Sequence, residues 1–173
     1  MHGLTNWIAA TPFSLLIQHN EVWMIPTIQS VHIAGIGVVL ACVLMMTLRI
    51  LGYAGADQSL LQTEERFGPW LRGALWVLLG TGLLLIVGEP ERELITFSFW
   101  AKMTLVATGT VIAFLFQRAL RTHGPDWEQS LTGRRSVKAM AVGTLLIWLA
   151  IVFLGRLIAY DHIWGPLSPS TKA

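Results

Sequence analysis

The sequence predicts an all-α integral membrane protein, a four-helix bundle preceded by a short interfacial helix. The 173 residues are 54% hydrophobic and only 13% charged, whereas about a quarter of the residues of a soluble domain are charged. Four stretches are long and apolar enough to cross a bilayer, which takes about 20 residues per helix. Strand-like alternation is missing from these stretches, and isolated β-segments would leave backbone groups unpaired in lipid.

The predicted spans cover about residues 22–51, 70–87, 97–120 and 137–160, within a single membrane domain of residues 1–173. Before them, residues 4–19, LTNWIAATPFSLLIQH, predict a helix in the membrane interface, in which Thr11 is the N-cap and Pro12 the first helical residue. Long polar loops are expected after the first span, GYAGADQSLLQTEERFGP, and after the third, RTHGPDWEQSLTGRRS. Each loop contains a Gly-Pro pair, which favours a break in the helix.

Most of the basic residues lie in the two long loops or next to them. Their side of the membrane carries Arg49, Arg66, Arg72, Arg118, Arg121, Arg134, Arg135 and Lys138, and the other side carries Arg92, Lys102, Arg156 and Lys172. The positive-inside rule therefore places both loops in the cytoplasm and both termini in the periplasm of a bacterial inner membrane. The basic residues flank apolar segments, so the expected partners are the lipid bilayer and proteins within it, and not nucleic acid.

Ionisable side chains within a span are costly and are therefore candidate functional groups. His32 lies roughly 6 Å, and Lys102 roughly 9 Å, from the middle of their spans toward the periplasm. Arg156 is expected nearer the same surface, and these three residues form the candidate cofactor-binding set. Gly35 would let another helix or a flat ring approach beneath the imidazole. The cytoplasmic half of the bundle is expected to be almost wholly apolar between the arginines, without a carboxylate.

An imidazole at this depth is suited to haem b or to a metal ion. The candidate metal ligands are His32, Met24 and Met103. Two histidines at one depth would favour bis-histidine haem, but the other four stand at other levels: His2, His19, His123 and His162. A five-coordinate haem or a His/Met pair stays open. So do two plainer interpretations, in which His32 bonds across helices and Lys102 extends to the headgroups.

Several short motifs resemble an uncharacterised bacterial membrane family, described as a domain of unknown function. They are Trp23, Pro26, Ser30 and His32 in the first span, LRILG at its end, FSFWAKMTL around Lys102, and GRLIAY around Arg156. The resemblance covers nearly the whole chain and implies an interfacial N-terminal segment and four spans. Thr47 stands where the family usually has aspartate. The four-helix form is also distantly similar to copper-resistance D-type proteins and b-type cytochrome bundles, as a likeness of fold.

Two functions follow from these observations. The first is a redox-type membrane subunit that binds haem b through His32 near the periplasmic leaflet. The second is a non-enzymatic accessory subunit that packs against a larger membrane complex, and copper handling at the periplasmic face is a third alternative. Motifs for hydrolysis or nucleotide binding are missing from the sequence, and whether the protein is an enzyme stays open.

Overall fold

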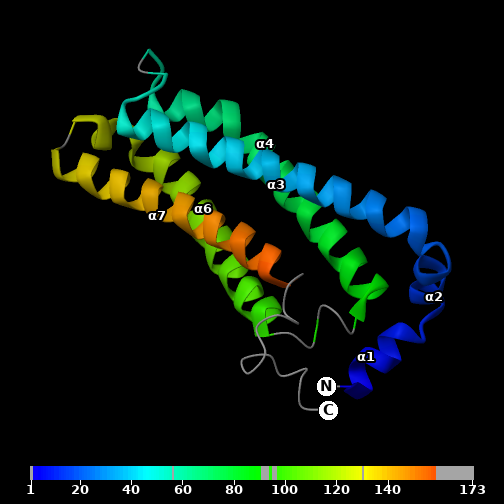
Figure 1. Cartoon of the computed structure of the whole chain (residues 1–173). Coiled ribbons are helices and arrows are strands. Elements are labelled where there is room, and N and C mark those ends of the chain that lie inside the picture. Colours follow the sequence, from blue (N-terminus) through cyan, green and yellow to red (C-terminus); the bar gives the residue numbers. More distant parts are fainter. Residues whose placement is uncertain (1, 56, 91–93, 95–96, 130, 159–173) are drawn as a thin grey trace.

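The computed structural model describes residues 2–55, 57–90, 94, 97–129 and 131–158. Every regular element in this part of the chain is a helix. Two are short, α1 (His2–Ala9) and α2 (Pro12–His19), and four are long: α3 (Glu21–Leu51), α4 (Leu60–Gly88), α6 (Phe97–Gln129) and α7 (Leu131–Ile158). Figure 1 shows α3 beside α4 and α6 beside α7, and the two pairs also meet through α3 with α7 and α4 with α6. The predicted all-α four-helix bundle is confirmed.

Four segments are long and apolar enough to cross a membrane: Glu21–Leu51, Leu60–Gly88, Phe99–Thr122 and Arg135–Arg156. Each overlaps one of the four stretches expected from the sequence, and the second begins ten residues earlier than expected. The predicted end of the fourth span, at residue 160, lies outside the described residues, as does the tail that follows it. The agreement is expected because hydropathy over some 20 residues decides whether a helix is stable in lipid.

The prediction of two long loops is wrong, because most of each stretch is helical. Helix α4 begins at Leu60, ten residues before the predicted span, and passes through Gly68 and Pro69. Its start is a capping box in which the Ser59 hydroxyl accepts from the Gln62 amide and the Gln62 side chain accepts from the Ser59 amide. Helix α6 likewise continues through the second Gly-Pro pair to Gln129, and α7 starts at Leu131. Proline is tolerated in such helices because packing against neighbouring helices offsets the lost backbone bond.

Helix α3 ends where the LRILG motif ends. Gly52 has φ of 88°, in the left-handed region that glycine adopts at little cost. Its amide donates to the Leu48 and Arg49 carbonyls, and the Tyr53 amide donates to the Leu48 carbonyl. The last turn of α3 thereby satisfies carbonyls that have no partner within the helix. The chain then reaches the start of α4 within a few residues.

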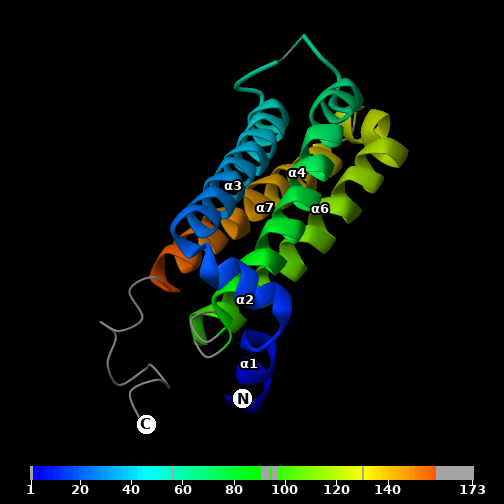
Figure 2. The same cartoon turned by 90° about the vertical axis from the view of Figure 1, so that its right-hand side faces the viewer.

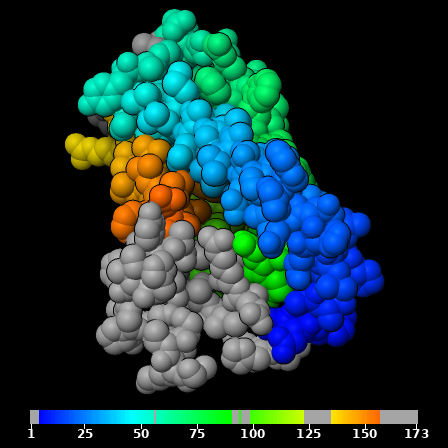
Figure 3. Space-filling model, turned by 45° about the vertical axis from the view of Figure 1, so that its right-hand side comes forward, coloured from blue at the N-terminus to red at the C-terminus, as the bar shows by residue number. Residues whose placement is uncertain are grey.

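The N-terminal segment forms two helices and not the single predicted one. The predicted cap is confirmed, because the Thr11 hydroxyl accepts from the Ser14 amide and Pro12 is the first residue of α2. Helix α2 docks on the end of α4, as Figures 2 and 3 show. There the buried Ser14 hydroxyl donates to the Val87 carbonyl at 2.7 Å, and Ile17 is fully buried beside Gly88.

The tightly packed core occupies one half of the bundle. We call the end at the α3–α4 connection (residues 52–59) the loop end and the opposite end, next to α1 and α2, the N-terminal end. On α3 the buried residues run from Gly35 to Thr47, in the half nearer the loop end. The packed clusters on the other helices fall at the same level and include Leu71, Phe116 and Trp148. His32 therefore lies beyond the most tightly packed layer, toward the N-terminal end.

Candidate functional site

The first candidate site, which we call the histidine site, comprises His32, Thr81 and Gly82. The half-buried His32 ring on α3 faces α4. Its Nδ1 atom lies 2.7 Å from the Thr81 Oγ1 atom. A Cβ atom built on Gly82 would lie 3.7 Å from the Cε1 atom of the ring, so glycine at this position leaves room for the imidazole. The ring is thus held between α3 and α4 and does not point into lipid.

The hydrogen bonds of Thr81 decide which ring nitrogen carries the proton. The Thr81 hydroxyl has one proton, and its oxygen lies 2.7 Å from the Val77 carbonyl, which can only accept. The hydroxyl therefore donates to Val77 and accepts from His32, so Nδ1 is the protonated nitrogen. In the neutral imidazole the lone pair is then on Nε2. A histidine whose Nδ1 proton is engaged by a neighbour is in the form that binds metals through Nε2.

Lys102 and Arg156 belong to the opposite helix pair. The half-buried Lys102 is on α6, and its Cδ atom would lie 3.9 Å from a Cβ atom on Gly155 of α7. Arg156 follows Gly155 directly, so α6 and α7 bring these two cations to one level of the bundle. His32 and Thr81 come from α3 and α4. Each of the four long helices therefore contributes at least one polar side chain to the half of the bundle nearer the N-terminal end.

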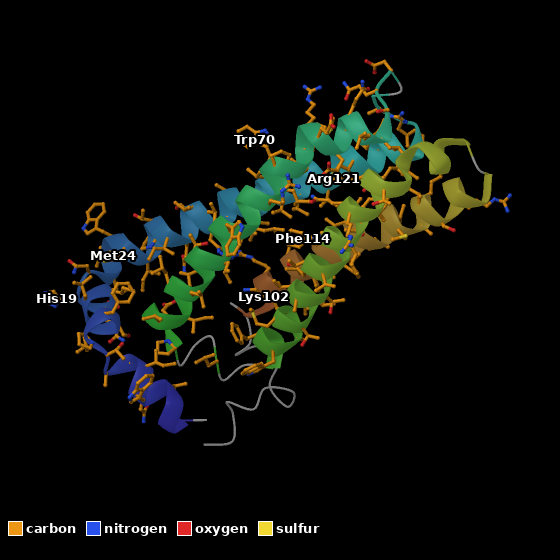
Figure 4. The ribbon with its side chains drawn as sticks, turned by 180° about the vertical axis from the view of Figure 1, so that it is seen from behind. His19, Met24, Trp70, Lys102, Phe114 and Arg121 are labelled. Carbon is orange, nitrogen blue, oxygen red and sulfur yellow. The ribbon has the colours of Figure 1, made fainter. Side chains whose placement is uncertain are left out.

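The two candidate methionine ligands, Met24 and Met103, are not placed beside His32 in a way that indicates a metal site. Met24 precedes His32 by eight residues on the same helix, a rise of about 12 Å. Figure 4 shows Met24 close to His19 at the start of α3, well away from Lys102. Met103 is 36% exposed on α6. Within the described part of the chain, no group of three or more His, Cys, Asp or Glu residues is placed to hold a metal ion. Ligation by His32 with either methionine stays a prediction.

Three features of the structure bear on a haem group. The engaged Nδ1 proton of His32 fits an axial ligand, and the cations Lys102 and Arg156 fit the charge of haem propionates. The space expected at Gly35 does not fit a flat ring, because the Leu78 side chain fills it. A Cβ atom on Gly35 would lie only 3.1 Å from the Leu78 Cδ2 atom. Gly35 therefore serves close packing of α3 on α4, the first of its two predicted uses.

A second site, which we call the buried ion cluster, comprises Glu64, Arg72, Gln117 and Arg121. The Glu64 side chain on α4 is 0% exposed. Its Oε2 atom accepts from Arg121 Nε at 2.8 Å, and its Oε1 atom accepts from Arg121 Nη2 at 3.0 Å and from Arg72 Nη1 at 3.3 Å. Arg72 Nη1 also donates to Gln117 Oε1 at 3.1 Å. Figure 4 shows Arg121 at the junction of α6 and α4, far along α6 from Lys102.

This cluster contradicts the expectation that the loop-end half is almost wholly apolar between the arginines and has no carboxylate. Glu64 falls in the stretch that was interpreted as a polar loop, and Gln117, Thr47 and Thr144 are also buried. A signal for the cluster exists in the sequence, because Glu64, Gly68 and Arg72 follow at intervals of four on one helical face. A Cβ atom on Gly68 would overlap Glu64 Oε1 and lie 3.1 Å from its Cδ atom. Gly68 thus provides the room that the carboxylate occupies.

In the buried ion cluster, two arginines stabilise the negative charge of the Glu64 carboxylate. Both carboxylate oxygens accept from guanidinium groups, and the Arg121 fork meets Glu64 in the two-point geometry typical of strong ion pairs. The arginine side chains are partly exposed, 33% for Arg72 and 52% for Arg121. The carboxylate is therefore buried while its counter-charges reach the edge of the bundle. This arrangement joins α4 to α6 and leaves no open carboxylate oxygen for acid–base chemistry.

Four apolar spanning helices with polar residues packed between them define a multi-pass helical membrane protein. The chain belongs to a family of unknown function, DUF6644, which it matches over residues 7–161. That range includes both candidate sites and all four spans. No curated protein and no solved structure matches the chain.

Proposed function

We propose that the protein is a membrane-embedded redox-type subunit that binds haem b through Nε2 of His32. The observation that carries this proposal is the hydrogen bond from His32 Nδ1 to Thr81, whose own proton is committed to the Val77 carbonyl. This pairing orients the imidazole and keeps Nε2 unprotonated, as an axial ligand requires. The distant resemblance to b-type cytochrome bundles points the same way, by analogy of fold.

The other members of the predicted site have roles in this proposal. Lys102 and Arg156 would hold the propionates, since both are cations near the N-terminal end. One-electron transfer is the chemistry that haem supplies when it is bound. The space over Gly35 is not available to the group, because the Leu78 side chain fills it.

The test is an absorption spectrum of detergent-purified protein, with metal analysis of the same sample. The proposal expects a Soret band that is lost in His32→Ala and kept in His19→Ala, which removes an exposed histidine on α2. A colourless preparation with no bound iron after expression with ample haem would overturn it. Stoichiometric copper, lost in His32→Ala or Met103→Ala, would instead support copper handling.

A second candidate is an accessory subunit that packs against a larger membrane complex. The observation that favours it is on α4, where Gly73 and Gly80 each face open space with no atom within 4 Å of an added Cβ. Small residues on an outer helical face allow another membrane helix to approach closely. Co-purification of a partner protein that is lost when Gly73 and Gly80 are both replaced by leucine would support this role, with Gly37→Leu on α3 as the control.

We also propose that the protein lies in a bacterial inner membrane with both termini in the periplasm. The distribution of Lys and Arg supports this orientation. Cysteines introduced at Asn6 and Asp57 test it, because the native Cys42 is buried. An impermeant maleimide should label Asn6→Cys in intact spheroplasts and Asp57→Cys only after lysis. The reverse pattern would overturn the orientation.

A further inference from the structure

A cavity of about 20 Å³ lies in the core near the loop end, between α3, α4, α6 and α7. A single water molecule needs about 10–15 Å³ on this scale, together with two to four polar partners. Most of the lining is apolar, but it includes Thr47 from α3, Gln117 from α6 and Thr144 from α7. All three side chains are at most 5% exposed. The cavity thus has room for one water and three polar residues around it.

The hydrogen bonds already formed by these residues determine what they can offer a ligand. The Thr47 hydroxyl donates to the Val43 carbonyl at 2.7 Å, and the Thr144 hydroxyl donates to the Met140 carbonyl at 2.8 Å. The one proton of each hydroxyl is thus used in a bond to a carbonyl, so each hydroxyl can only accept a hydrogen bond from a molecule in the cavity. The lining threonines therefore act as two acceptors.

Gln117 supplies the complementary group. Its neighbour Arg72 can only donate, so the atom 3.1 Å from Arg72 Nη1 is the amide oxygen. The amide nitrogen of Gln117, with its two protons, is thereby available as a donor. Two acceptors and one donor match a water molecule, which donates two hydrogen bonds and accepts others. A cation could not accept a hydrogen bond from the Gln117 amide. An anion could not donate hydrogen bonds to the two threonine hydroxyls.

We propose that this cavity is a binding site for one ordered water molecule, held by Thr47, Gln117 and Thr144. The water donates to the two hydroxyl oxygens and accepts from the Gln117 amide. Through Gln117 it extends the buried ion cluster, which joins only α4 and α6, to α3 and α7. Polar contacts then link all four spans at one level of the bundle.

A second buried polar group lies near this site. The indole Nε1 of Trp148 has no hydrogen-bond partner among the described residues, although Trp148 is 3% exposed. Trp148 follows Thr144 by one helical turn and packs in the same cluster as Val43 and Leu71, which line the cavity. An unpaired buried donor at such a position is often satisfied by ordered water. Trp148 does not itself line the cavity, so its indole is a separate candidate for hydration within the same cluster.

Water-edited solid-state NMR of the full chain in lipid bilayers tests the proposal, with threonine and valine labelled. Magnetisation from water should reach Thr47 and Thr144 sooner than Val39, which is fully buried in the same core. Equal, slow transfer to all three residues would overturn the proposal, because it would mean a dry cavity. This measurement uses the wild-type protein and so does not depend on any variant folding.

A matched pair of variants tests the coordination. Thr144→Val removes one acceptor from the cavity, while Thr108→Val removes the same type of hydroxyl-to-carbonyl bond, 2.8 Å long, at an exposed position of α6. Thr144→Val should reduce the water transfer to Thr47 at least twofold and lower the melting temperature more than Thr108→Val does. Unchanged transfer to Thr47 in Thr144→Val would overturn the assignment of Thr144 as a partner of the water.

Discussion

The carboxylate of Glu64 on α4 accepts two hydrogen bonds from the guanidinium of Arg121 on α6, at 2.8 and 3.0 Å. The two residues are 57 positions apart in the chain, and Glu64 is fully buried. Burying a carboxylate is costly unless it is paired and hydrogen-bonded. The ion pair therefore contributes to the contact between the two helix pairs, beside the apolar clusters that they share, and the first predictions concern it.

Replacing Glu64 by glutamine should destabilise the bundle. The amide keeps the shape but loses the charge, and its NH2 group cannot accept from a guanidinium, so a hydrogen bond to a charged group is lost. The expected loss of unfolding free energy is about 1.5–3 kcal/mol. Denaturation of the protein in mixed detergent and SDS micelles measures it. Glu65→Gln, at the exposed neighbouring position, should change stability by less than about 0.5 kcal/mol, and equal effects of the two substitutions would argue against the cluster.

Replacing Arg121 by lysine should lower the melting temperature although the charge is kept. Lysine presents a single ammonium in place of the planar fork that meets both Glu64 oxygens. Arg118→Lys, one turn earlier at another exposed position of α6, is the matched control and should leave the melting temperature unchanged. A melting temperature of Arg121→Lys equal to that of the wild type would show that the two-point geometry does not matter.

Two glycines of α4 should respond oppositely to alanine. At Gly68 the added methyl group overlaps the Glu64 carboxylate, whereas at Gly73 it meets nothing within 4 Å. Gly68→Ala should therefore cost about 1–3 kcal/mol, as overpacking does. Gly73→Ala should leave stability unchanged or raise it by up to about 1 kcal/mol, because alanine has the higher helix propensity. Unfolding in SDS provides the comparison, and a neutral Gly68→Ala would contradict the close contact.

Docking of the N-terminal helices should depend on Ser14. Its hydroxyl donates to the Val87 carbonyl, which lies in the last turn of α4 and has no partner within the helix. Ser14→Ala removes this bond and should speed backbone hydrogen exchange in residues 2–20, as measured by mass spectrometry. Ser30→Ala removes a hydroxyl bonded within its own helix to the Pro26 carbonyl. That control should leave the exchange of residues 2–20 as it is in the wild type.

The tautomer of the His32 ring should depend on the side chain at position 81. Nitrogen-15 NMR of labelled histidine should show Nδ1 protonated in the wild type, because Thr81 accepts from it. Thr81→Ser keeps the acceptor and should preserve this tautomer, whereas Thr81→Val should shift the proton toward Nε2. Thr27→Val, which removes a hydroxyl bonded to the Trp23 carbonyl, is the control. Protonation of Nε2 in the wild type would remove the support for an axial ligand at this position, whatever the haem content.

The spans and the cap of α2 were predictable because each depends on a short stretch of sequence. Hydropathy over one helix length identifies a span, and the Thr11-Pro12 pair identifies a helix start by its local bonding. The position of His32 in the half of the bundle nearer the N-terminal end was predictable for the same reason. Its partner Thr81 was not, because the pairing depends on how α3 and α4 pack.

Glu64 was missed because its surroundings in the sequence are misleading. The segment TEERFGP is polar and ends in Gly-Pro, the composition of a loop, yet the Ser59 capping box starts a helix ahead of it. What makes a buried carboxylate acceptable is Arg121, on a helix that the local sequence does not include. The same holds for Thr47 and Gln117, whose burial follows from the meeting of four helices and not from either segment alone.

Glu64 and Arg121 enter the membrane at different times during synthesis. The hairpin of α3 and α4 leaves the ribosome first, with Arg72 of the same helix as the counter-charge for the carboxylate. Only when the α6–α7 hairpin has been inserted does the second guanidinium arrive. Until then the carboxylate accepts one guanidinium hydrogen bond, from Arg72, and lacks the two that Arg121 donates in the finished chain. The two-point ion pair therefore forms only after both hairpins have been inserted and have met.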